Sequence, residues 1–161
     1  MANYTGADVI TASDVTKYQP DAFGFGISTT ATETVNFLAQ TTNDLLRQLR
    51  IEWWPVYKTN IFTDITVLNT AEMVNTKVNL DQFERAGVYL FLGRFYLPAL
   101  TKFRPETEKD RFERMSEYYM SQYNSEWRMI LEDGVEYDSD EDATISVNER
   151  EPLHGSKRLI R

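Results

Sequence analysis

The sequence has no cysteine and only one histidine, so several kinds of chemistry are missing from it. Without cysteine there is no disulfide, no thiolate metal site and no cysteine nucleophile. The single histidine, His154, stands beside Gly155 and lacks the ordered acid and activated hydroxyl that a catalytic triad needs. The chain also lacks a glycine-rich phosphate loop and an α/β pattern that would hold a nucleotide. We therefore expect a protein that is not an enzyme.

Long apolar runs and an excess of basic residues are missing as well. The longest apolar run, residues 87–93, is far shorter than the roughly 20 residues that span a bilayer. Residues 1–5 lack the basic start and apolar core of a secretory signal. The net charge is −8, whereas a module that binds duplex DNA normally carries a basic face. We expect neither membrane insertion nor tight binding of nucleic acid.

Helical periodicity dominates what is present in the 161 residues. Apolar side chains recur at helical spacing over residues 32–53, 80–100 and 106–131, and Gly134 follows as a helix stop. A short helix is expected from an N-cap at Ser13 to Tyr18. The signal over residues 55–77 is weak, and within it residues 60–68 are either a strand or an irregular connector. The pattern predicts an all-α fold: a bundle of three to four helices over residues 1–134 with an arm over residues 1–27. Residues 135–161 are predicted to form a separate C-terminal region.

Aromatic residues make up 13% of the chain, which is a high share. Trp53 and Trp54 close the first long helix, and four more aromatics lie in predicted loops: Phe23, Phe25, Tyr57 and Phe62. They either cap the core of the bundle or fill pockets on an adjacent subunit, since aromatics are enriched at both places.

The C-terminal region contains an acidic loop, residues 138–149, that nearly matches a calcium-binding pattern. Calcium prefers six to eight oxygen ligands, and side chains at loop positions 1, 3, 5 and 12 with the carbonyl at position 7 can wrap one ion. The candidate metal ligands are Asp138, Asp140, Asp142, Thr144 (through its carbonyl) and Glu149. Calcium is therefore the one cofactor that the sequence suggests.

Two residues depart from the calcium-binding pattern. Position 6, where glycine makes a sharp turn, is Ala143, and a left-handed backbone at alanine costs on the order of 1 kcal/mol. Pro152 is hard to place inside a following helix, so we expect a small loop or hairpin with an extended exit. The alternative to ion binding is a solvated acidic turn, in which dense carboxylates pair with arginines of a neighbour.

The acidic loop is followed by a basic tail. This tail is either a frayed terminus or a peptide that docks on an acidic partner surface with apolar anchors. The candidate partner-binding residues are Leu153, His154, Lys157, Arg158, Leu159, Ile160 and Arg161.

Several motifs follow one another in a particular order along the chain. The earlier motifs are Thr11 with Ser13-Asp14-Val15, then Trp53-Trp54-Pro55, and residues 96–102. The C-terminal motif runs from Leu131 through Gly134 and Tyr137 into the acidic loop and ends at Pro152, His154, Arg158, Leu159 and Arg161. This order resembles the head-to-tail adaptor (connector, neck) proteins of tailed bacteriophages. The glycine that such proteins have at loop position 6 is Ala143 in this chain.

The resemblance implies a structural virion protein that is assembled in the host cytoplasm and located at the neck between head and tail. Such adaptors form a homo-oligomeric ring, typically of twelve copies, under the portal protein. The ring extends the channel through which genomic DNA passes without specific binding, and the next neck or tail protein attaches to it. The resemblance makes residues 153–161 the portal-contacting peptide. The alternative function is a soluble calcium-binding interaction module that works alone.

Overall fold

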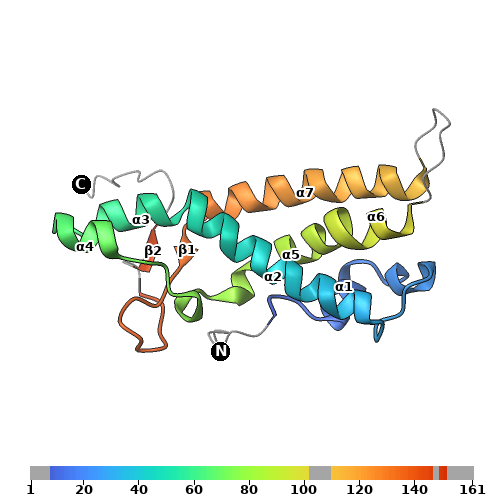
Figure 1. Cartoon of the computed structure of the whole chain (residues 1–161), viewed down its shortest axis with the longest axis horizontal. Coiled ribbons are helices and arrows are strands. Elements are labelled where there is room, and N and C mark those ends of the chain that lie inside the picture. Colours follow the sequence, from blue (N-terminus) through green and yellow to red (C-terminus); the bar gives the residue numbers. More distant parts are fainter. Residues whose placement is uncertain (1–7, 102–109, 147–148, 152–161) are drawn as a thin grey trace. The chain divides into compact units, whose positions relative to one another are not determined.

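The structure is a computed structural model that describes residues 8–101, 110–146 and 149–151. These residues are mostly helical, which confirms the all-α prediction (Figure 1). The elements in chain order are α1 (Ala12–Tyr18), η1 (Ala22–Phe25), α2 (Thr32–Glu52), α3 (Trp54–Ile61), α4 (Ile65–Thr70), η2 (Asn75–Lys77), η3 (Leu80–Phe83), α5 (Glu84–Leu90), η4 (Phe91–Tyr96), α6 (Leu97–Leu100), α7 (Arg111–Asp133), β1 (Val135–Glu136) and β2 (Arg150–Glu151).

The described residues form two compact units. Unit 1 comprises residues 45–82 and 128–151, and unit 2 comprises residues 8–44 and 83–127. The helices α2 and α7 each contribute residues to both units. The separation of residues 1–134 from residues 135–161 is a different kind of division and stays a prediction.

The single helix predicted over residues 80–100 is divided in the structure into η3, α5, η4 and α6. The π-helical segment η4 separates α5 from α6, and Pro98 lies in the first turn of α6, where proline is tolerated. Gly93 in η4 permits a close approach of α7, because an added Cβ would lie 2.9 Å from the backbone nitrogen of Met120. The hydroxyl of Ser116 donates to the Gly93 carbonyl at 2.6 Å. A residue with a side chain at this position would therefore not allow the same close contact.

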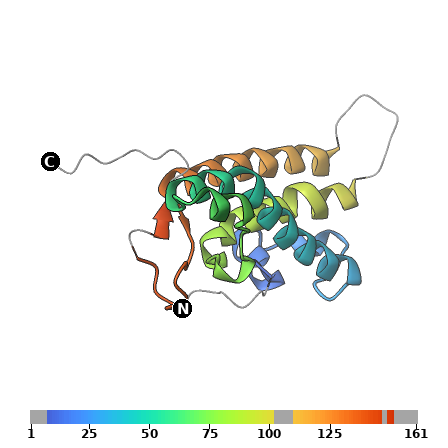
Figure 2. The same ribbon diagram turned by 60° about the vertical axis from the view of Figure 1, so that its left-hand side comes forward.

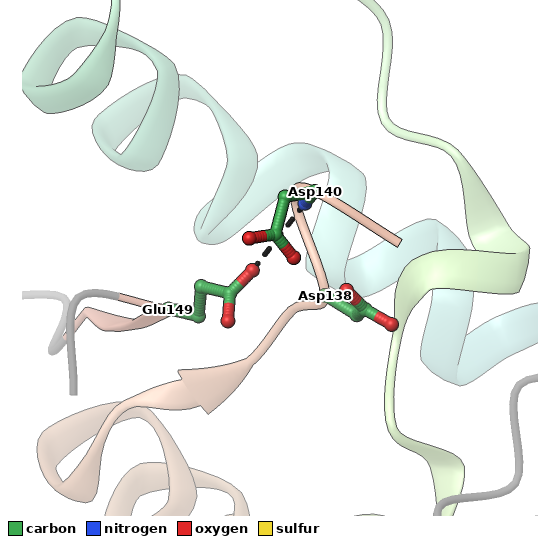
Figure 3. Close-up of side chains that lie close together, drawn as sticks. All are labelled: Asp138, Asp140 and Glu149. Atoms are coloured by element: carbon green, nitrogen blue, oxygen red, sulfur yellow. Dashed lines mark hydrogen bonds between the residues drawn. The ribbon is translucent and has the colours of Figure 1, made fainter. Parts of the chain in front are cut away.

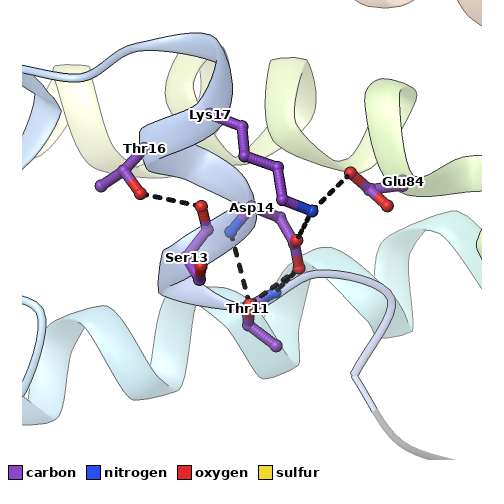
Figure 4. A network of polar contacts seen from close by, with 6 residues as sticks. All are labelled: Thr11, Ser13, Asp14, Thr16, Lys17 and Glu84. Atoms are coloured by element: carbon purple, nitrogen blue, oxygen red, sulfur yellow. Dashed lines mark hydrogen bonds and ion pairs between the residues drawn. The ribbon is translucent and has the colours of Figure 1, made fainter.

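The start of α1 differs from the prediction, because the N-cap is Thr11 and not Ser13. Thr11 forms a capping box with Asp14, in which each residue accepts a backbone N–H of the other (Figure 4). Ser13 lies inside the helix, and its carbonyl accepts a hydrogen bond from the hydroxyl of Thr16. The segment around α1 is packed, since Val9, Ile10, Val15 and Ala22 are buried.

In unit 1, the residues with an ambiguous pattern form α3 and α4, so the predicted strand alternative for this segment is wrong. Pro55 lies in the first turn of α3, which explains why α2 ends just before it and a new helix begins. Trp53, Trp54 and Tyr57 are buried, and their ring centroids lie 5.3–5.6 Å from that of Tyr137. These three aromatics belong to the core, as the first of the two alternatives predicts.

The helix α7 ends at a glycine, as predicted. Gly134 has a φ of +101°, a left-handed value that favours glycine, and its N–H donates to the carbonyl of Ile130 at 3.0 Å. Along α7, the apolar spacing predicted from the sequence matches burial at Tyr119, Tyr123, Trp127 and Ile130, whereas Phe112 and Met115 are half-buried. The predicted start of this helix at residue 106 lies outside the described residues.

Candidate metal-binding loop

A two-stranded hairpin holds both ends of the acidic loop. The strands β1 and β2 pair antiparallel, with Val135 opposite Glu151 and Glu136 opposite Arg150 (Figure 2). The N–H of Tyr137 extends this pairing by donating to the carbonyl of Glu149 at 3.1 Å. A strand therefore follows Glu149 where a calcium hand would have a helix, so of the predicted loop or hairpin the structure has the hairpin. The predicted extended exit lies outside the described residues.

The segment around η2 fixes the first residue of the loop. The N–H of Asp138 donates to the carbonyl of Lys77 at 2.9 Å, and Val78 forms a β-bridge with Tyr137. The hydroxyl of Tyr137 accepts a hydrogen bond from the N–H of Val74 at 3.2 Å, and burial raises the pKa of this hydroxyl. Because Tyr137 is held by the aromatic cluster and by this backbone, Asp138 has a fixed position at the loop entrance.

The loop bends at two residues with left-handed backbone, Glu141 at φ +63° and Ala143 at φ +62°. Three nested hydrogen bonds stabilise the bends. Asp138 Oδ2 accepts the N–H of Ala143 at 3.0 Å, Asp140 Oδ1 that of Asp142 at 3.3 Å, and Asp142 Oδ1 that of Thr144 at 2.7 Å. Ala143 thus adopts the conformation for which the calcium pattern uses glycine, at a cost of about 1 kcal/mol.

Glu149 closes the loop through its side chain. Glu149 Oε1 accepts the N–H and the hydroxyl of Ser139, at 2.6 and 2.8 Å, and the N–H of Asp140 at 3.4 Å. Its Oε2 accepts the N–H of Ser146 at 2.9 Å. Burial alone would raise the pKa of this carboxyl, but the hydrogen bonds from Ser146 and Ser139 outweigh it and lower the pKa to about 2. Glu149 is therefore a carboxylate at neutral pH.

Three carboxylates meet in the folded loop. Asp138, Asp140 and Glu149 each offer an oxygen, and these oxygens lie within 4.8 Å of one another (Figure 3). A group of this kind could hold a metal ion. The carboxylate of Asp142 is outside the group and Thr144 is exposed, so a ligand role for these two residues stays a prediction.

One oxygen of the group stands out. Asp138 is only 5% exposed, and its Oδ1 has no hydrogen-bond partner among the residues that the structure describes. Buried polar atoms nearly always have a partner, and a carboxylate oxygen without one carries a desolvation cost. An ion or water molecule at this oxygen would supply the missing partner.

Basic side chains reach the rim of the loop but not its centre. Lys77 Nζ lies 2.9 Å from Glu141 Oε1 and donates to the carbonyl of Ser139 at 2.8 Å. The hydrogen bond to Glu141 raises the pKa of Lys77. Arg150 pairs with Glu136 on the hairpin. Within the described part of the chain, no lysine or arginine forms an ion pair with Asp138, Asp140 or Glu149.

The contact of Lys77 with this loop could not be predicted from the sequence. Lys77 is separated from Ser139 by 62 positions, and no local pattern links the two residues. The predicted partner-binding residues of the tail lie outside the described residues: Leu153, His154, Lys157, Arg158, Leu159, Ile160 and Arg161.

Comparison with known proteins gives no relative. No family model, no curated protein and no solved structure matches the chain. In the described residues, no helix combines the length and the apolar character that crossing a membrane requires.

Proposed function

We propose that the chain is a non-enzymatic structural protein of the virion, a connector subunit at the head-tail neck of a tailed bacteriophage. Copies of the chain form a ring between the portal protein and the tail, and the DNA passes through this ring without specific binding. The ring carries the next neck or tail protein. The order of sequence motifs suggests this role, and one feature of unit 1 supports it.

The supporting observation is a set of exposed apolar side chains on consecutive elements of unit 1. The helix α4 has no buried residue, and its Ile65 is 72% exposed. The other large apolar side chains exposed in this part of the chain are Ile51, Ile61, Val67 and Val74. Water contact with so many apolar groups is unfavourable, and a neighbouring copy in a ring would cover them. A closed ring of identical chains joins two different patches, so the covering surface lies elsewhere on the neighbour.

Mass measurement and negative-stain imaging, with and without the portal protein of the same virus, test this function. We expect rings on the portal, and we expect Ile65→Glu to prevent them because it places a charge in the covered surface. Thr66→Glu adds the same charge to α4 without removing an apolar side chain, and it serves as the matched control. A chain that stays monomeric in the presence of portal would contradict the proposal.

Calcium binding is a second candidate function, favoured by the buried Asp138 oxygen that lacks a partner. Calcium–oxygen distances are 2.3–2.6 Å, so oxygens on opposite sides of one ion lie up to about 5 Å apart. The spacing of the three carboxylates falls inside this limit. Asp138, Asp140 and Glu149 would hold the ion, joined by the predicted ligands Asp142 and the Thr144 carbonyl. A monomer that binds calcium and ignores portal would be a stand-alone calcium-binding module.

A further inference from the structure

We infer that calcium binding by the acidic loop is coupled to the pairing of β1 with β2, so that the position of β2 regulates the affinity for calcium. The inference rests on the calcium candidate function. A cluster of acidic residues alone would not indicate a ligand. The independent observation is that Asp138 is buried while one of its oxygens has no partner among the described residues.

Glu149 links the metal group to the hairpin. Its side chain is one of the three clustered carboxylates, and its carbonyl accepts the N–H of Tyr137. It directly precedes Arg150, the first residue of β2, which pairs with Glu136. A displacement of β2 would therefore pull the Glu149 carboxylate away from Asp138 and Asp140.

Gly134 sets the position of β2 from the opposite side of the hairpin. A Cβ at this residue would lie 2.9 Å from Arg150 Cγ, closer than real Cβ contacts, and 3.0 Å from the Arg150 carbonyl oxygen, tighter than most of them, so the side chain and backbone of Arg150 would have to shift. The hairpin is held further by Gln82, whose side chain donates to the Gly134 carbonyl at 2.7 Å and accepts the N–H of Glu136 at 3.0 Å. Gly134 and Gln82 thus hold the hairpin through contacts that involve none of the proposed metal-binding carboxylates.

Coupling of this kind is reciprocal. Pairing of the hairpin changes the free energy of calcium binding by the same amount as calcium binding changes the free energy of pairing. Bound calcium would hold Glu149 and thereby protect the hairpin from opening. In the other direction, opening of the hairpin would weaken calcium binding.

Calcium titration by calorimetry, with the full chain and two glycine variants, tests the coupling. Gly134→Ala displaces β2 without changing a charge or a ligand, and we expect it to weaken calcium binding about tenfold. Gly24→Ala is the matched control, because nothing lies within 4 Å of an added Cβ there, and its affinity should equal that of the unchanged chain. A Gly134→Ala variant with native circular dichroism and unchanged affinity would overturn the inference.

Hydrogen exchange of the unchanged chain gives a second readout that does not depend on the folding of a variant. We expect calcium to slow exchange of the Tyr137 amide, which donates to the Glu149 carbonyl. Calcium binding without slower exchange at Tyr137 would overturn the coupling and leave the calcium site intact. An unchanged chain that releases no heat with millimolar calcium would overturn both the site and the coupling.

Discussion

The structure contains two carboxylate networks, one at the start of α1 in unit 2 and one in the acidic loop of unit 1, and they differ in their counter-charge. At α1, Asp14 accepts hydrogen bonds from Thr11 and lies 2.6 Å from Lys17 Nζ (Figure 4). Lys17 also reaches Glu84 at 3.4 Å. Burial alone would raise the pKa of Asp14, but the hydrogen bonds from Lys17 and Thr11 lower it overall. This network contains its own cation.

The acidic loop satisfies Glu149 with N–H and hydroxyl donors but brings three carboxylates together without a paired cation in the described residues (Figure 3). Like charges at this spacing repel each other unless a positive charge or a proton compensates. In both networks one carboxylate, Asp14 or Glu149, accepts hydrogen bonds from backbone N–H groups and so stabilises the local backbone. The difference is that, in the described residues, no lysine or arginine forms an ion pair with the three carboxylates, since Lys77 at the rim pairs with Glu141 instead, and this difference leads us to propose a bound cation.

Removal of the Glu149 carboxylate, which closes the loop, should cause the largest loss of stability. Glu149→Ala leaves the N–H groups of Ser139 and Ser146 without their acceptor, and hydrogen bonds to charged groups are the stronger ones. We expect the free energy of unfolding to fall by about 3 kcal/mol. Urea denaturation measures it, with Glu132→Ala as an exposed control. An equal effect of the two variants would contradict the closing role of Glu149.

Acidification should remove part of the same stabilisation. The folded pKa of Glu149 is about 2, below its ordinary value of 4.5, so its contribution is complete above pH 4.5 and is lost as the pH falls toward 2. At pH 3 the carboxyl is only partly protonated, so the loss is smaller than in Glu149→Ala. The difference in unfolding free energy between the unchanged chain and Glu149→Gln should shrink over this range. A constant difference would show that the Glu149 pKa is not lowered.

A substitution in the network at α1 should lower stability less and should leave the response to calcium unchanged. Asp14→Ala removes the capping-box partner of Thr11, and we expect a loss of about 1 kcal/mol in unfolding free energy. Calcium should stabilise this variant as much as it stabilises the unchanged chain, because Asp14 belongs to the other network. Thermal melts with and without calcium check both statements. A smaller stabilisation of Asp14→Ala by calcium would contradict the assignment of calcium binding to the acidic loop alone.

The smallest effect is expected at the bend of the loop. Ala143→Gly relieves a left-handed alanine but adds backbone entropy to the unfolded chain, so we expect a net gain of about 0.5 kcal/mol. Ala71→Gly is the control in the same unit, because Ala71 has an ordinary φ of −66° and should only lose stability. Equal losses in both variants, measured by urea denaturation, would contradict the strained bend.

Local patterns predicted much of this fold. The helices α2 and α7, the glycine stop at Gly134 and the hairpin around the acidic loop all follow from spacing, caps and turn residues close together in the sequence. The cap of α1 was misplaced because Thr11 and Ser13 are both good N-cap residues, and only the bond to Asp14 distinguishes them. Residues 60–68 are rich in β-branched side chains, but 60–61 end α3 and 65–68 lie in α4, so β-propensity was a poor guide there.

The candidate site was predicted in part, for a similar reason. The spacing of acidic residues identified Asp138, Asp140 and Glu149, because alternation in a tight loop brings such side chains together. The contacts from Lys77 and Tyr137 depend on how distant segments pack, and no local pattern contains that information. Nor could the sequence indicate that Asp138 is buried with one oxygen lacking a described partner.

Calcium titration of the unchanged chain by isothermal calorimetry tests directly whether the acidic loop binds a cation. We predict one calcium ion per chain, binding that is lost in Asp138→Asn, and binding that persists in Asp14→Asn, where the charge removed belongs to the network with its own lysine. Absence of heat at millimolar calcium, or equal binding by Asp138→Asn, would contradict cation binding by the loop.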